Sequence, residues 1–463
     1  MSNIRRLLAL GACALLGACG TASAPVPVPS PSSPADAGSA TADAWPMYGH
    51  DAQRTNYNPA EKTITTANVG QLVVSWTVDV GTSAVPSNSA PTVANGHVYV
   101  GSSVAQGSNF FAFDATTGQL VWGADLHYTF DASCDIYENV GIPSTAAVAN
   151  GVVIVGGGDA AYYGLDEKTG VILWRHDLNV GRSGFAWESP LVANGRAYIG
   201  ISTRCDNPPV RGEVRALDIG TGTLLANQFF IPPGVGGASV WNSPAMTTDG
   251  KTLVVATGED NGDHSPYEQA IVTLDATTLQ ILSANRQGAT GQDDDLGTSP
   301  VVFHDANGRT LVAASIKGGT TYAWDLASLA SGPIWQRNAG AIVGLAPAYD
   351  PTAGPGGTLF FGGYDGDHYT GGNGLLYAVD PATGADRWPP FLAGNMAGNV
   401  AIAGGLVFVN TGTGGVAVLD DQKGTVLTVL HPANPAGTFS GVTVTGGTVY
   451  WKSGQFLNAW RPS

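Results

Sequence analysis

Hydrophobic and polar positions alternate along the chain in a recurring unit of twelve residues, clearest at Phe111–Trp122, Phe-Ala-Phe-Asp-Ala-Thr-Thr-Gly-Gln-Leu-Val-Trp. An apolar run, an Asp, a Thr-Gly pair and a Trp in this order are typical of a strand, a tight turn and a second strand. We expect Asp114 to accept hydrogen bonds from turn amides, Gly118 to supply a positive φ and Trp122 to pack between neighbouring sheets.

The unit is repeated to the end of the chain. Its copies are Tyr163–Trp174, Arg215–Leu225, Ile271–Leu282, Thr321–Trp335, Leu376–Trp388 and Val416–Leu427. Counted from Asp114, the Asp positions lie 52, 52, 57, 50, 55 and 40 residues apart, a period typical of propeller blades of four strands.

The two ends of the repeat array complete each other. Phe456–Trp460 supplies a third strand with no fourth after it, and Leu72–Val80 stands before the first complete unit. The sequence therefore predicts an all-β fold, an eight-bladed β-propeller of four-stranded antiparallel blades closed by N- and C-terminal strands in one sheet. The segment Trp45–Asn58 shows no strand alternation, and we expect it to lie across the ring.

Composition changes this picture little. A length of 463 residues alone suggests about three domains, but the repeat assigns residues 45–463 to one propeller. The 64 glycines and 12% charged residues fit a chain of many tight turns. The net charge of −16 argues against nucleic acid and an anionic lipid surface as partners.

The N-terminus predicts export. Arg5 and Arg6 precede the apolar run Leu7–Leu16, and Leu-Gly-Ala-Cys19 resembles the lipobox of bacterial lipoproteins. We interpret residues 1–19 as a lipoprotein signal peptide with Cys19 lipidated, and residues 20–44, rich in Pro, Ala and Ser, as a flexible tether. The alternative is an ordinary signal peptide cut a few residues later. Either implies a periplasmic or cell-envelope location.

Two cysteines remain after the signal, Cys134 and Cys205, and in an oxidising compartment this pair is a disulfide candidate between loops of successive blades. The motif Cys-x-x-Cys-His is absent from the sequence, so we expect no covalent c-type haem.

Short motifs that contain Ser and Pro mark the expected start of the innermost strands, where the chain nears the ring axis. They are Ser89-Ala90-Pro91, Pro143-Ser144, Ser189-Pro190, Ser243-Pro244 and Ser299-Pro300. Residues just before them are expected to line one mouth of the channel, among them Trp187-Glu188 and Trp241-Asn242.

From about Trp45 to Trp460 the repeat resembles that of the pyrroloquinoline quinone (PQQ) propellers, in particular the alcohol and polyvinyl-alcohol dehydrogenases. In those enzymes the quinone lies on a Trp in a Gly-Gly-x-x-x-Trp motif, and Gly236–Trp241 is similar. A Thr-Gly-Asn strand end binds calcium through its Asn, for which Ala256–Glu259 offers Glu259.

The resemblance implies two further roles. A catalytic Asp follows a Gln in an acidic loop, which points to Asp295, with Asp293 as the alternative, either to ligate the metal or to take the alcohol proton. A cation eight residues before a repeat Asp contacts the quinone carbonyls, and Lys317 stands eight residues before Asp325.

Some positions depart from the family. Ser133-Cys134 replaces adjacent cysteines, Val140 replaces an Arg, and the first metal carboxylate before Val210-Arg211-Gly212 is offered only by Asp206 or Asn207. Glu188 faces either the quinone edge or solvent at the rim. Packing between blades for Trp241, a solvated turn for Lys317 and a polar loop cap for Asp293–Asp295 are the structural alternatives.

The sequence thus supports an exported propeller that binds PQQ and Ca²⁺, or another divalent or trivalent cation, and oxidises a small or polymeric alcohol with a separate electron acceptor. The competing hypothesis is a cofactor-free envelope scaffold that binds other envelope proteins, because outer-membrane assembly lipoproteins carry eight such blades too.

Overall fold

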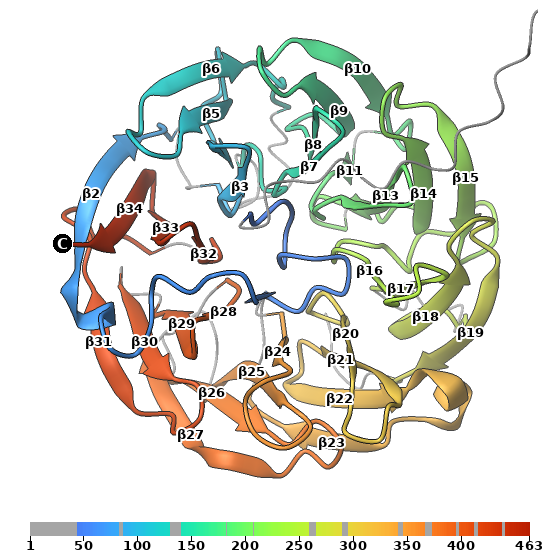
Figure 1. The fold of residues 1–463 in the computed structure, drawn as a ribbon. Coiled ribbons are helices and arrows are strands. Elements are labelled where there is room, and N and C mark those ends of the chain that lie inside the picture. Colours follow the sequence, from blue (N-terminus) through green and yellow to red (C-terminus); the bar gives the residue numbers. More distant parts are fainter. Residues whose placement is uncertain are drawn as a thin grey trace, which may run out of the picture. The chain divides into compact units, whose positions relative to one another are not determined.

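Eight sheets stand around a common axis in the computed structural model (Figure 1), each built on four antiparallel strands, and two of them have a fifth strand added. The structure describes residues 44–82, 87–129, 140–181, 183–206, 208–258, 265–288, 295–340, 346–365, 373–394, 398–411, 415–437 and 440–463. Over these ranges, no helix has the length and apolar character needed to cross a membrane.

The first four blades follow one another in the chain. Blade 1 consists of β3 (Thr92–Ala94), β4 (His97–Gly101), β5 (Phe110–Asp114) and β6 (Leu120–Ala124). Blade 2 consists of β7 (Ala147–Ala149), β8 (Val152–Gly156), β9 (Ala161–Asp166) and β10 (Ile172–Asp177). Blade 3 consists of β12 (Leu191–Ala193), β13 (Arg196–Thr203), β14 (Glu213–Asp218) and β15 (Leu224–Phe229), with β11 (Gly184–Phe185) added to β13. Blade 4 consists of β16 (Ala245–Met246), β17 (Thr252–Ala256), β18 (Ala270–Asp275) and β19 (Ile281–Arg286).

The other four blades complete the ring. Blade 5 consists of β20 (Val301–His304), β21 (Thr310–Ser315), β22 (Thr320–Asp325) and β23 (Trp335–Asn338), with the 3₁₀ helix η3 (Leu326–Ser331). Blade 6 consists of β24 (Ala348–Asp350), β25 (Thr358–Asp365), β26 (Asn373–Val379) and β27 (Asp386–Gly394). Blade 7 consists of β28 (Ala401–Ala403), β29 (Leu406–Asn410), β30 (Val416–Asp420) and β31 (Val426–Leu430), with β1 (Tyr57–Asn58) added in parallel to β28. Blade 8 consists of β32 (Thr443–Thr445), β33 (Thr448–Ser453), β34 (Phe456–Pro462) and β2 (Leu72–Asp79), which follows the 3₁₀ helix η1 (Val69–Gln71).

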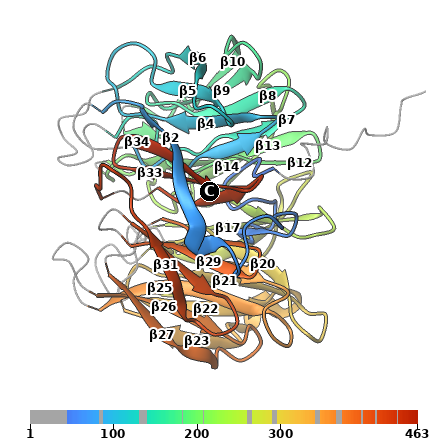
Figure 2. The same ribbon diagram turned by 60° about the vertical axis from the view of Figure 1, so that its left-hand side comes forward.

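The ring closes as the sequence predicts. Strand β2 from the N-terminal side pairs antiparallel with β34, from Leu72 opposite Pro462 to Asp79 opposite Phe456. Figure 2 shows β2 running along the outside of the ring beside β34. Because segments near both ends of the chain contribute to one sheet, closure is held by a ladder of backbone hydrogen bonds, with one register shift between Val74 and Trp76.

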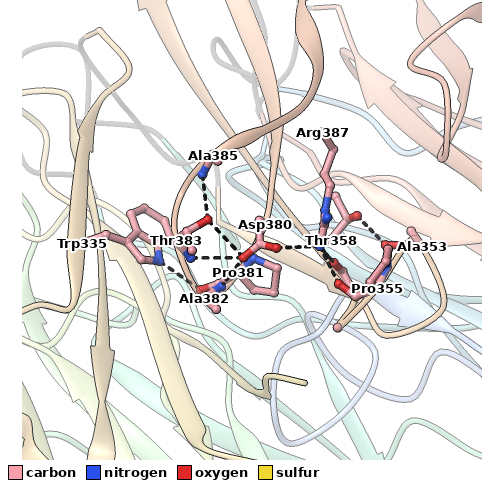
Figure 3. Close-up of polar contacts among 12 residues, drawn as sticks. Trp335, Ala353, Pro355, Thr358, Asp380, Pro381, Ala382, Thr383, Ala385 and Arg387 are labelled. Carbon is pink, nitrogen blue, oxygen red and sulfur yellow. Dashed lines mark hydrogen bonds and ion pairs between the residues drawn. The ribbon is translucent and has the colours of Figure 1, made fainter. Parts of the chain in front are cut away.

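The repeat Asp organises the turn between the third and fourth strands. In blade 6, Asp380 accepts hydrogen bonds from the backbone amides of Ala382 (2.9 Å) and Thr383 (3.1 Å) and from the Thr383 hydroxyl (3.2 Å) (Figure 3). The indole of Trp335 in blade 5 donates to the Pro381 carbonyl at 2.9 Å. One turn therefore both shapes its own hairpin and receives the Trp of the preceding blade.

We call this Trp, with the carbonyl and the glycine of the next turn, the Trp latch. It is present at five seams, where the donors and acceptors are Trp76 to Ala115, Trp122 to Glu167, Trp174 to Ile219, Trp335 to Pro381 and Trp388 to Asp421. A Cβ on the turn glycine would lie 2.5 to 2.9 Å from the indole at each of these seams. Glycine is needed there both for its positive φ and for this close contact.

The latch is replaced where the Trp is missing. Ala226 of blade 3 stands at the Trp position, and the glycine position of blade 4 is Leu279, which is buried in the same apolar cluster. At the next seam Ser283 stands at the Trp position, and the glycine position is the buried Leu329 of η3. A large side chain on one blade thus compensates for a small one on the other.

This compensation predicts non-additive mutations. Ala226→Trp alone places an indole against Leu279, and we expect it to lower the free energy of unfolding by about 1–3 kcal/mol. Leu279→Gly alone opens a cavity at a cost of about 2–5 kcal/mol. The double variant rebuilds a Trp latch, so its loss in denaturant titrations should be smaller than the sum by at least about 1 kcal/mol. Strictly additive losses would refute the compensation.

A second set of contacts joins the blades near the axis. At the start of the innermost strands, each backbone amide donates to the hydroxyl at the same place in the next blade: Ala90 to Thr145, Thr145 to Ser189, Ser189 to Ser243 and Ser243 to Ser299, at 2.9–3.0 Å. Ser189, Ser243 and Ser299 belong to the Ser-Pro pairs of the sequence, Ala90 lies between Ser89 and Pro91, and Thr145 follows Pro143-Ser144. The accepting hydroxyls tie blades 1 to 5 together around the channel.

The segment 45–58 crosses the ring and touches every blade, as expected (Figure 1). Its hydrogen-bond partners, one from each blade in turn, are Val93, Val148, Ser189, Met246, Val302, Tyr349, Ile402 and Val444. Because this segment fills the axis on one side, the innermost strands are held at fixed distances from one another.

Candidate functional site

Asp295 and Lys317 form an ion pair in blade 5. The Lys317 Nζ atom lies 2.9 Å from Asp295 Oδ2, and the side chains are 20% and 1% exposed. The Lys317 amide also donates to the Asp295 carbonyl at 2.9 Å. Asp295 precedes β20 and Lys317 follows β21, so the antiparallel pairing of these strands brings the two residues together. A charge pair this well buried is strengthened by the low dielectric around it.

Trp241 from blade 4 presents its ring to the same lysine. The Lys317 Nζ atom lies 4.8 Å from the centroid of the indole, within the range of a cation–π interaction. The indole Nε1 atom is buried and donates no hydrogen bond within the described residues. Three of the residues predicted from the sequence, Trp241, Asp295 and Lys317, therefore meet at the seam between blades 4 and 5.

The end of strand β17 lies against this group. A Cβ placed on Gly258 would lie 3.5 Å from Asp295 Cγ and 2.9 Å from Ser239 Oγ, so only glycine fits there without displacement. The Gly258 amide donates to the Ser239 carbonyl at 2.7 Å. Glu259, the next residue, and Asp293 lie outside the described residues, so their predicted roles stay predictions.

Backbone packing positions Trp241. The Gly212 amide donates to the Gly237 carbonyl at 2.8 Å, and the Gly237 amide donates to the Val210 carbonyl at 2.9 Å. A Cβ on Gly212 would lie 1.7 Å from the Ala238 carbonyl oxygen. The glycines of both motifs thus let a loop of blade 3 run directly beside the segment that leads to Trp241.

Asp206 lies in a loop of blade 3 with its side chain exposed and its backbone at φ 56. Its carboxylate accepts a hydrogen bond from the Thr203 hydroxyl. Within the described ranges, no three His, Cys, Asp or Glu side chains are grouped closely enough to hold a metal ion. Cys205 is in a disulfide bond, while its predicted partner Cys134 lies outside the described residues.

Glu188 is buried at the seam between blades 2 and 3, where the Tyr162 hydroxyl donates to its Oε1 atom at 2.5 Å. Burial raises the pKa of Glu188 to about 8, opposed by hydrogen bonds from Tyr162 and the Gly200 amide and by the charge of Arg54. Because the folded state holds this proton more tightly, the associated stability is lost as the pH rises toward 8.

The position of Glu188 has a structural counterpart in other blades. Ser89, Ser144 and Thr298 occupy the same place, one residue before the inner hydroxyl position, and accept the amides of Gly101, Gly156 and Ser315. Glu188 accepts the corresponding Gly200 amide. The observed contacts of Glu188 are therefore with other residues of the propeller, and its predicted contact with a quinone stays a prediction.

Arg54 was not singled out from the sequence. It is fully buried, and its guanidinium donates to the carbonyls of Pro244 (2.8 Å), Ser189 (3.2 Å) and Tyr48. Burial lowers its pKa to about 10. Arg54 joins the segments that carry Trp241 and Glu188, but its place in an irregular segment with positive φ gives no sequence pattern by which to find it.

Comparison with known proteins gives matches along most of the chain. Residues 45–278 match the family model described as the β-propeller domain of glucose/ethanol/alcohol dehydrogenase. Residues 330–456 match the model of the outer membrane protein assembly factor BamB. Trp241 lies within the first match, and Asp295 and Lys317 lie between the two.

Individual relatives agree with the first match. The chain is 25% identical to the quinohemoprotein alcohol dehydrogenase of Comamonas testosteroni over 92% of its own length, and spans 61% of that protein. It is 23% identical to the polyvinylalcohol dehydrogenase of a Pseudomonas species over 90% of its length, and spans 74% of that protein. The crystal structure of the Comamonas enzyme superposes with a TM-score of 0.71 at 18% identity, covering 91% of this chain and 81% of that one.

Proposed function

This chain belongs to the glucose/ethanol/alcohol dehydrogenase β-propeller family, and we propose that it is a quinoprotein dehydrogenase that oxidises an alcohol with bound PQQ. The observation that carries the proposal is the buried ion pair of Asp295 and Lys317 on the face of Trp241. Such a group of a planar π-face, a carboxylate and an ammonium fits a flat anionic cofactor and an alcohol hydroxyl.

Each of the three residues would have a separate role in this reaction. Trp241 offers the indole face on which the planar ring system would rest. Lys317 holds a positive charge where the cofactor carbonyls would accumulate negative charge. When bound, PQQ supplies the two-electron acceptor for the hydrogen lost from the alcohol carbon. Asp295, which pairs with Lys317, would accept the hydroxyl proton.

A cation is part of the proposal. Asp295 and Glu259 would supply oxygen ligands to Ca²⁺ or a related hard cation, with Asp206 as a third candidate and Asp293 as the alternative to Asp295. The position of Gly258 supports this proposal. Gly258 lies beside the Asp295 carboxylate, and Glu259 is the next residue in the chain. Glu188 would contribute to the cofactor site only from the neighbouring seam.

The N-terminal sequence motif supports a proposal for where the reaction takes place. We propose an exported lipoprotein anchored through Cys19, which oxidises a small or polymeric alcohol and passes electrons to a separate acceptor. The envelope-scaffold alternative has the support of the BamB match over residues 330–456. It gives no reason for a buried lysine–aspartate pair on a tryptophan face, so we favour the dehydrogenase.

The test is a cofactor titration of the full chain. PQQ with Ca²⁺ should quench tryptophan fluorescence saturably, and the loaded protein should reduce an artificial dye when an alcohol is added. Trp241→Ala should weaken PQQ binding by about fivefold or more, because stacking on an aromatic face contributes about 1 kcal/mol or more. Absence of saturable binding by the wild-type chain would leave the scaffold as the function.

A further inference from the structure

Two acidic side chains meet at the seam between blades 6 and 7, two blades along the ring from the candidate site. Asp350 ends strand β24 and is fully buried, and Asp421 follows strand β30 and is 3% exposed. The Asp350 Oδ1 atom accepts the amide and the hydroxyl of Thr352, each at 2.7 Å. The side chain of Asp421 makes a hydrogen bond with that of Asp350.

Few charges surround this acid pair. The described titratable groups that face it are Tyr57 from strand β1 and Asp420 on the same turn. Lys423 lies close by but pairs with Asp420 Oδ2 at 3.0 Å, with its side chain 71% exposed. Apart from the Asp421 carboxyl, no donor within the described residues reaches the Asp350 Oδ2 atom, which is buried. Neighbouring cations therefore do not neutralise the pair.

Two buried carboxyl groups in hydrogen-bond contact need a proton between them, because two adjacent negative charges in a low dielectric repel strongly. We propose that Asp350 and Asp421 share one proton and form a pH-sensitive contact, which holds blades 6 and 7 together in acid and weakens as the pH rises. The strand β1 of the N-terminal segment pairs with β28 of blade 7, so a weakened contact between Asp350 and Asp421 also loosens the end of that segment.

The titration of Asp421 agrees with this geometry. Burial, then the charge of Asp350, raises the pKa of Asp421 to about 7, well above that of an exposed aspartate. A carboxyl whose pKa is raised on folding contributes stability in acid, and that contribution is lost as the pH rises toward 7.

The seam between blades 1 and 2 supplies an internal control. Glu167 follows the repeat residue Asp166 just as Asp421 follows Asp420, and the carbonyls of both Glu167 and Asp421 receive a Trp latch. The Glu167 Oε1 atom, however, accepts from the amide of Asn95 at 2.6 Å and from the Tyr99 hydroxyl at 3.4 Å. An amide donates at any pH, so the Asn95–Glu167 contact needs no shared proton.

Hydrogen exchange of the full chain between pH 5 and 8 tests the proposal, after correction for intrinsic exchange rates. Protection of the amides around Asp350 and Asp421 should fall by up to about tenfold per pH unit until about pH 7, as expected for the loss of one proton on opening. Protection around Asn95 and Glu167 should change much less. A local measurement is needed because Glu188 gives global stability a pH dependence of the same sign.

The matched variant is Asp350→Asn, which gives the seam the amide–carboxylate pair of blades 1 and 2. It should reduce the pH effect on protection to about twofold or less across the same range while the protein remains folded. Equal pH dependence at both seams of the wild type, or unchanged dependence in Asp350→Asn, would overturn the shared proton. Recovery of protection at pH 8 by millimolar Ca²⁺ in the wild type, lost in Asp350→Asn, would also overturn it in favour of a cation site.

Discussion

Asp295→Asn is expected to lower kcat for alcohol oxidation by about 10³-fold or more while leaving PQQ binding within a fewfold of wild type. The amide keeps the size of the carboxyl group but cannot accept the hydroxyl proton. It also leaves Lys317 without its ion-pair partner, 2.9 Å away in the wild type, so that the lysine remains available to the cofactor. Dye reduction by the reconstituted enzyme measures kcat, and tryptophan quenching measures binding.

Asp305→Asn is the matched control for this variant. Asp305 is also a buried carboxylate of blade 5, paired with Arg309 at 2.7 Å, but it lies in the turn after strand β20. This variant should lose stability without a specific loss of kcat. If Asp295→Asn keeps wild-type turnover, the proton acceptor is another residue, and Asp293 is then the first to examine.

Trp174→Ala is expected to lower the free energy of unfolding by about 3–5 kcal/mol, among the largest effects of a single change in this fold. The indole is 7% exposed and donates to the Ile219 carbonyl at 2.8 Å. A Cβ on Gly164 or Gly222 would lie 2.1 or 2.6 Å from its ring, so the indole fills the space between two glycines. Neither glycine can close the cavity that the alanine leaves.

Denaturant titration followed by circular dichroism measures this loss. Leu173→Ser on the same strand is the control, because Leu173 is 50% exposed and the change should stay within about 0.5 kcal/mol. A Trp174→Ala variant as stable as Leu173→Ser would show that the Trp latch does not hold the blades together.

The candidate site could be predicted in part from the sequence. The resemblance of their motifs to those of the PQQ propellers indicated Trp241, Asp295 and Lys317, and the three side chains do meet, because each motif lies at a fixed place in a repeating blade. Glu188 was also selected from its place near an innermost strand, yet its carboxylate lies between blades against Tyr162. Sequence position gives the location of a backbone along the blade but not the direction taken by a long side chain.

The contacts of Arg54 and of the acid pair Asp350 and Asp421 could not be predicted from residue spacing in the sequence. Arg54 comes from an irregular segment and joins carbonyls of residues more than a hundred positions away. Asp350 ends an innermost strand and Asp421 begins a turn of the next blade, and in the sequence both look like ordinary turn residues. Their chemistry depends on burial and on a neighbour, both of which arise only when the ring closes.

By itself, the sequence determined the period, the eight blades, the closing strand pair and the turn in which an Asp, a Gly and a Trp cooperate. These are set by contacts repeated in every blade, so local pattern and global fold agree. The tertiary structure alone decided which side chains of separate blades face one another: the Trp latch and its Ala226–Leu279 substitute, the Asp295–Lys317 pair on Trp241, and the shared environment of Asp350 and Asp421. The physical reason is that these contacts depend on side-chain packing between segments that are distant in the chain, and alternation within one strand does not specify which distant side chain it meets.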